Sequence, residues 1–114
     1  MSKKSTSIII DDILSFIDRI QLYTDIVSFD DFTANAMMVE ACLYNIQIIG
    51  EAVTDLDDNI KAANPQIPWI LITNMRNRIT HEYAGVDLPA IWNVIKQDLP
   101  YLKVQLTKLK NTLP

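Results

Sequence analysis

One polar stretch of this sequence holds the residue types that are best suited to chemistry. It contains two of the three arginines, Arg76 and Arg78, and the only histidine, His81. If the stretch is a helix, with about 100° per residue, Asn77 and Thr80 fall between the directions of the first arginine and the histidine. A guanidinium is a fixed fork of donors, the amide and hydroxyl are neutral donors, and an imidazole exchanges protons near neutral pH. Because this ridge carries no carboxylate, it favours a phosphate ligand, and Arg78 is a further candidate to support that ligand.

A purely structural interpretation explains the same residues. A lone histidine near a helix end commonly caps backbone carbonyls, and polar residues opposite a core face are usually only solvated. From the spacing alone, both interpretations stay open. Other kinds of site fit less well, because one histidine and one cysteine cannot form an ordinary zinc site and no glycine-rich phosphate loop is present. The paired aspartates lie at predicted helix ends, where capping explains them better than acid–base work.

The composition is that of a small globular protein that does not coat nucleic acid. The chain has 114 residues, enough for a single domain over residues 1–114, and 49% of them are hydrophobic. A net charge of −4 disfavours non-specific nucleic-acid binding. Residues 1–68 carry eleven acidic and four basic side chains, whereas residues 69–114 carry three acidic and six basic ones. This uneven charge is compatible with a local anion site in the second part of the chain.

We expect the protein to stay in the cytoplasm and not to contact a membrane. No apolar run reaches transmembrane length. The basic N-terminus is followed by only three isoleucines and then two aspartates, which is too short and too acidic for a signal peptide. The single cysteine, Cys42, excludes an internal disulfide and fits a reducing compartment. Its place in an apolar helical pattern predicts a buried small hydrophobe rather than a nucleophile.

The elements that must position the polar ridge are predicted to be helices. Two glycines in the whole chain argue against a turn-rich β fold, and apolar residues recur at three- and four-residue steps almost everywhere. We predict helices over about 7–27, 30 or 31 to 56, 68 or 69 to 81 or 83, and 87 onward. Pro100 cannot sit inside a regular helix, so either Asp98 caps a new helix there or the helix kinks. With a short helical turn after residue 57, the chain is predicted to be an all-α antiparallel bundle of four main helices.

Two features of the predicted second helix, from about Asp30 or Asp31 to Leu56, concern its neighbours. The helix is apolar on more than one side, so it is central in the core, has a partner chain on its second face, or both. Gly50 lies in its middle, where glycine is costly unless something packs closely against it. It marks either a close approach of two helices or a tolerated weak position.

The residues from Arg76 to Tyr83 match the R-x-x-x-x-H-x-Y signature of the HepT-like toxins, which are HEPN-domain proteins. The segments before and after the motif, residues 69–75 and 84–87, resemble that family too. So do residues 47–52 and 91–100, and the resemblance covers nearly the whole chain. We find no departure from the motif.

The resemblance implies a metal-independent endoribonuclease without a cofactor, built as a HEPN-like homodimer whose two motif helices meet in one cleft. RNA supplies its own nucleophile, the 2′-hydroxyl, so a base and a charge stabiliser suffice. We assign His81 as general acid or base and Arg76 as the group that holds the phosphate, with Asn77 positioning the phosphate or His81. On one helix Arg76 and His81 diverge by roughly 140°, which favours a site completed across a two-fold axis.

The resemblance also implies a partner, an MNT-type nucleotidyltransferase antitoxin, in a type VII-like toxin–antitoxin module. In this family's signature the tyrosine, here Tyr83, accepts AMP from that partner. Its spacing alone allows two positions equally, at the edge of the anion site or packed beside Ile79 and Ile72. An alternative function is a non-catalytic helical dimer that binds a nucleotide or a partner protein with the same ridge.

Overall fold

The computed structural model describes residues 5–81 and 85–113, with Thr80 and His81 described by their backbone only. Over these residues the chain is helical and contains no strand, which confirms the predicted all-α class. The elements in order are α1 (Thr6–Thr24), α2 (Phe29–Ala34), α3 (Ala36–Thr54), α4 (Asp58–Ala63), α5 (Trp69–His81), α6 (Leu88–Asn93), the π-helical turn η2 (Val94–Asp98) and α7 (Leu99–Thr112).

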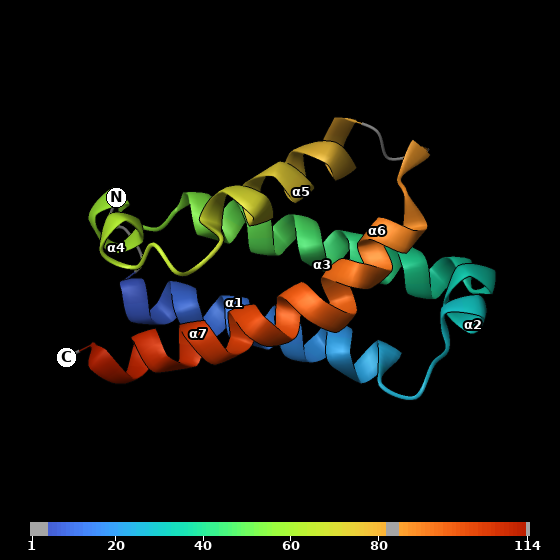
Figure 1. Cartoon of the computed structure of the whole chain (residues 1–114), viewed down its shortest axis with the longest axis horizontal. Coiled ribbons are helices and arrows are strands. Elements are labelled where there is room, and N and C mark those ends of the chain that lie inside the picture. Colours follow the sequence, from blue (N-terminus) through green and yellow to red (C-terminus); the bar gives the residue numbers. More distant parts are fainter. Residues whose placement is uncertain (1–4, 82–84, 114) are drawn as a thin grey trace.

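The four longest helices run in alternating directions along the long axis of the molecule (Figure 1). The central helix, α3, packs against α5 on one side and α1 on another, and α1 also packs against α7. The short helices α2 and α4 lie at opposite ends of the bundle (Figure 1). This arrangement confirms the antiparallel bundle and leaves α5 with α3 as its main neighbour.

The core is built almost entirely of aliphatic side chains from the four long helices. Isoleucine dominates, since β-branched and long aliphatic side chains interdigitate well between packed helices. The fully buried large side chains are Ile10, Ile13, Ile17, Ile20, Phe32, Ile49, Ile67, Ile79, Ile91, Ile95, Leu102 and Leu106. Cys42 is completely buried as well, and burial raises the pKa of its thiol to about 11. The thiol is therefore protonated at neutral pH, as expected for a buried hydrophobe rather than a nucleophile.

The predicted long second helix is wrong in one respect, because it is broken at Asn35. This residue ends α2 and also caps α3, where its side-chain oxygen accepts a hydrogen bond from the backbone N–H of Met38 at 3.1 Å. Its extended backbone, with φ −111° and ψ 93°, interrupts the helical path. Asparagine is among the best N-cap residues, so the break has a local cause that the apolar periodicity concealed.

Two predicted helix boundaries also change. The first helix begins at Thr6, close to the predicted start, with Ser5 as its cap, but it ends at Thr24 and not near residue 27. Asp98 makes no side-chain capping bond to α7. Instead, the π-helical turn η2 comes directly before the segment that contains Pro100. In this turn the N–H of Leu99 donates to the carbonyl of Val94, five residues earlier and not four. The predicted kink at Pro100 thus takes the form of a π turn.

Among the described helices, α3 is long and apolar enough to cross a membrane by length and composition. A central helix of a bundle meets the same criterion, and α3 occupies that position here.

Candidate functional site

The motif helix α5 is held in one rotation by its apolar side. Its first residue, Trp69, is buried, and the indole N–H donates to the carbonyls of Lys61 and Asn64, both at 3.1 Å. Further along, Ile72, Met75 and Ile79 are buried, as their spacing predicts. Leu71, next to Ile72 in the sequence, is 42% exposed. The opposite side of α5 therefore faces solvent.

The polar ridge lies on that solvent side. Asn74 and Asn77 are exposed, whereas Thr73 is half-buried. The Thr73 hydroxyl donates to the carbonyl of Trp69 at 3.1 Å, so its hydrogen is engaged inside the helix. Asn77 is thus placed where a ligand can reach it, one helical turn before His81.

Arg76 lies where α5 touches α3, and the reason is Gly50. A β-carbon built on Gly50 would stand 2.8 Å from Cγ of Arg76, closer still to its Cβ, and 3.4 Å from the carbonyl oxygen of Ile72. The two helices can therefore approach this closely only because residue 50 has no side chain. Of the two interpretations of Gly50, the structure selects the close helix approach.

The same contact constrains the Arg76 side chain. The residue is half-buried and its Nε is shielded from solvent. A guanidinium that leaves a helix–helix seam has few rotamers open to it, so less entropy is lost when it binds an anion. The seam therefore fixes the first part of the Arg76 side chain, Cβ and Cγ, against α3.

Arg78 occupies a different side of the helix. It follows Arg76 by two residues, which is roughly 200° around α5. It is exposed and lines a small hollow with Asp87 and Ile91 at the start of α6. Within one chain the two arginines therefore do not converge on one phosphate. Arg78 and His81, by contrast, are three residues apart and occupy neighbouring positions on one face.

The remaining candidates lie at the end of α5. Thr80 and His81 are its last two residues, and their side chains are not among the described ones. Tyr83 lies outside the described residues altogether. Gly85, which we expected to stop the helix, does not adopt a positive φ, so it is not a left-handed cap. The described part of α5 ends at His81, within the predicted boundary.

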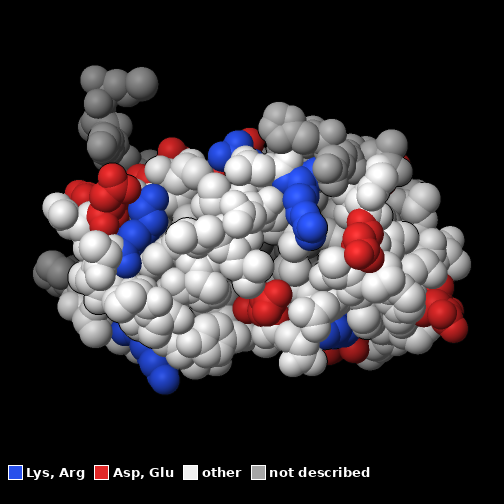
Figure 2. All heavy atoms as spheres, turned by 45° about the horizontal axis from the view of Figure 1, so that its top comes forward, with Lys and Arg blue, Asp and Glu red and all other residues white. Residues whose placement is uncertain are grey.

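Charge on the α5 face is sparse. Figure 2 shows isolated lysine and arginine side chains separated by uncharged surface, with acidic side chains among them. Such a face does not form a continuous basic track along which a nucleic-acid backbone would lie. Among the described residues there is also no group of three or more histidine, cysteine or acidic side chains that could hold a metal ion. The local anion site predicted from the sequence is the arrangement that this surface can support.

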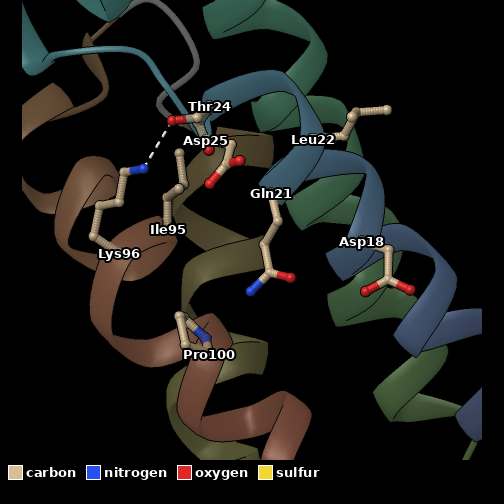
Figure 3. A pocket seen from close by; sticks show the side chains of 8 residues that line it. All are labelled: Asp18, Gln21, Leu22, Thr24, Asp25, Ile95, Lys96 and Pro100. Atoms are coloured by element: carbon tan, nitrogen blue, oxygen red, sulfur yellow. Dashed lines mark hydrogen bonds between the residues drawn. The ribbon is translucent and has the colours of Figure 1, made fainter.

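A larger hollow of about 520 Å³ lies elsewhere, between the end of α1 and the η2–α7 junction (Figure 3). The Lys96 ammonium crosses toward α1 and donates to the carbonyl of Thr24 at 2.8 Å. The same ammonium stands 4.8 Å from the centre of the Trp92 ring. Lys96 thus joins the C-terminal end of α1 to η2. Among the described side chains of the motif helix none lines this hollow, and nothing in the sequence pattern indicated it.

The sequence is similar to known proteins over almost its whole length. The model of the family described as "Ribonuclease HepT-like" matches residues 13–109. A protein of Thermococcus cleftensis named "Probable ribonuclease HepT" is 33% identical over 95% of this chain and 98% of its own length. "Putative RNase MJ0125" of Methanocaldococcus jannaschii is 30% identical over 96% of this chain and 94% of its own.

A second protein of that organism, "Gamma-glutamylcyclotransferase and putative RNase MJ0434", is 34% identical over 97% of this chain. The chain spans only half of that relative's length. No solved structure matches the chain.

Proposed function

Because this chain belongs to the ribonuclease HepT-like family, we propose that it is a metal-independent endoribonuclease whose reaction centre is formed by Arg76 and His81. The observation that supports the proposal is the Gly50 contact, which holds Cβ and Cγ of Arg76 against α3, next in sequence to the exposed Asn77. The names of the relatives support RNA as the substrate.

The proposed reaction uses the RNA itself as the nucleophile. A general base removes the proton of a 2′-hydroxyl, the oxygen attacks the adjacent phosphorus, and the bond to the 5′-oxygen breaks. The leaving oxygen takes up a proton, so the products are a 2′,3′-cyclic phosphate and a 5′-hydroxyl. His81 exchanges these protons, whereas Arg76 stabilises the charge that develops on the phosphoryl oxygens. Asn77 and Thr80 supply neutral donors to the same group.

We propose that the active form is a homodimer. The central helix α3 has only 39% of its most apolar window buried within the chain. On its free side Met37 is 81% exposed and Tyr44, two turns later, is 63% exposed. A second copy of this chain on that face would bury these side chains and bring a second motif helix close. Arg76 and His81 diverge by roughly 140° around α5, so each could complete a site together with a residue of the other copy.

We further propose that the protein is the cytoplasmic toxin of a type VII-like module, silenced by an MNT-type nucleotidyltransferase that attaches AMP to Tyr83. The support is the family signature, in which this tyrosine follows the histidine by two residues. A phosphate held next to Arg76 would compete with RNA for the same donors.

The test of the reaction is cleavage of structured RNA by the purified chain in excess EDTA. His81→Ala and Arg76→Ala should each lower the rate by at least about 100-fold, since acid–base and charge-stabilising groups typically contribute this much or more. Arg19→Ala is the matched control, because Arg19 is an exposed arginine that lies over Phe16 on α1. A requirement for magnesium, or full activity of both motif variants, would refute the mechanism. Binding of RNA without cleavage would favour the alternative of a binding module.

A further inference from the structure

A small hollow lies beside the motif helix, on the side away from α3. It has a volume of about 70 Å³ and is enclosed by α5 and the start of α6. Met75, Ile79 and Ile91 form its apolar floor and are each less than a tenth exposed, whereas Arg78 and Asp87 are its exposed charged residues. This volume exceeds what a single water molecule needs and accepts the edge of one planar ring.

The position of the hollow connects it to the proposed reaction. Arg78 precedes His81 by three residues on α5, so the two positions are about one helical turn apart on the same face. A strand whose reacting phosphate lies at the end of α5 would therefore bring a neighbouring nucleotide to the hollow. Arg76 lies against α3, on another side of the same helix, so in the proposed homodimer the phosphate would be held by the corresponding arginine of the other copy.

The chemistry of the lining fits a nucleobase. The faces of a base are apolar and suit the floor, whereas its edge carries donors and acceptors for charged groups. Arg78 supplies donors and can also stack on the ring. Asp87 supplies only acceptors, and its side chain is already oriented because Oδ1 accepts a hydrogen bond from the N–H of Ala90 at 3.2 Å. A carboxylate and a guanidinium that line the same hollow can together read an edge on which an amino group lies next to an acceptor.

We propose that this hollow is a base-recognition subsite that selects cytosine over uracil next to the cleaved phosphate; the inference rests on the proposed ribonuclease function. The small volume admits a pyrimidine edge more readily than a whole purine. Cytosine presents an N4 amino group that a carboxylate accepts, and its N3 and O2 are acceptors for the arginine. Uracil has the oxygen O4 where cytosine has the amino group. This oxygen and the Asp87 carboxylate are both acceptors, so they would repel each other. Asp87 is therefore the residue that discriminates, and Arg78 is the residue that anchors.

The experiment compares RNA oligonucleotides that differ only by cytosine or uracil at each position flanking the cleaved bond. Cleavage by the wild-type chain should be roughly 5- to 100-fold faster with cytosine at one of these positions, the discrimination that one good base contact provides. Asp87→Asn is the diagnostic variant, because asparagine still caps α6 but offers a donor to the O4 of uracil. The ratio of the two rates should then fall to about one or invert.

Two further measurements make the outcome decisive. Asp57→Asn is the matched control, since Asp57 caps α4 as Asp87 caps α6, and it should leave the ratio unchanged. Binding of the same oligonucleotides to His81→Ala, measured by fluorescence anisotropy, reports base preference without cleavage. If the wild type cleaves without preferring cytosine, or if Asp87→Asn keeps the preference in both assays, the subsite is refuted while the ribonuclease stands. If no His81-dependent cleavage occurs but the binding preference follows Asp87, the ribonuclease is refuted while the subsite stands.

Discussion

At Gly50 the backbone of α3 lies against the side chain of Arg76, so the site depends on a residue that performs no chemistry. Alanine in the middle of a helix normally stabilises it by about 1 kcal/mol relative to glycine. Here the added methyl group would stand 2.8 Å from Cγ of Arg76 and closer to its Cβ, an atom that cannot swing away. Its clash must therefore separate the two helices or rotate the arginine.

We expect Gly50→Ala to lower both stability and RNA cleavage. Overpacking costs about 1–3 kcal/mol, which outweighs the gain in helix propensity. Chemical denaturation and cleavage rates measure the two effects. Gly85→Ala is the matched control, because nothing lies within 4 Å of the β-carbon that it adds. Unchanged stability and activity of the Gly50 variant would mean that the close approach is unimportant.

Tyr83 is expected to be the single site of AMP attachment. Co-expression with a neighbouring nucleotidyltransferase should add one or more AMP-sized increments to the intact mass and abolish toxicity. Tyr83→Phe should gain none and stay toxic, because it lacks the hydroxyl nucleophile. Tyr44→Phe removes an exposed tyrosine hydroxyl on α3 and should still be modified. An inhibited wild-type protein without added mass would indicate neutralisation by binding alone.

At the scale of elements, caps and breakers decide where the helices begin and end. Side-chain caps at Ser5, Ser28, Asn35, Asp57 and Asp87 begin successive helices. Each satisfies a backbone N–H that has no partner inside its own helix. The motif helix differs, since its start is held by the buried indole of Trp69. Its rotation, and hence the direction of its polar ridge, is therefore set by tertiary packing.

The break at Asn35 offers a direct test of this local control. Asn35→Ala removes the bond to the N–H of Met38 and should lower the free energy of unfolding by about 1 kcal/mol. Urea denaturation measures the change. Asn59→Ala, an exposed asparagine inside α4, should change stability much less. Equal stability of the wild type and Asn35→Ala would show that the break is imposed by packing rather than by the cap.

At the scale of the whole molecule, the exposed side of α3 predicts self-association. Light scattering should give about twice the 13.0 kDa chain mass at micromolar concentration. Tyr44→Glu should shift the protein to monomer and lower RNA cleavage, because it buries a charge in the proposed contact. Ile26→Glu is the matched control, since Ile26 is 96% exposed and lies beyond the end of α1. A monomeric wild type with full activity would remove the composite site.

The sequence alone was sufficient to predict the helical class, the alternating bundle and the start of the motif helix at Trp69. These features follow from local information, namely apolar spacing, prolines and the polar ridge that the spacing leaves outside. The same information could identify Arg76 and His81 as candidates and give the angle between them. It missed the break at Asn35, because the apolar pattern continues across a residue whose capping bond interrupts the helix.

Only the tertiary structure decided what each side of the motif helix faces. A helical pattern fixes the angles between residues, but it does not say which neighbour lies at which angle. The contact with Gly50 places Arg76 against α3, whereas the hollow with Asp87 places Arg78 against α6. Gly50 lies on α3 and Asp87 at the start of α6, whereas both arginines lie on α5. No local sequence pattern therefore connects them. Their meeting is a consequence of how the helices pack together, which is set by the burial of apolar side chains over the whole chain.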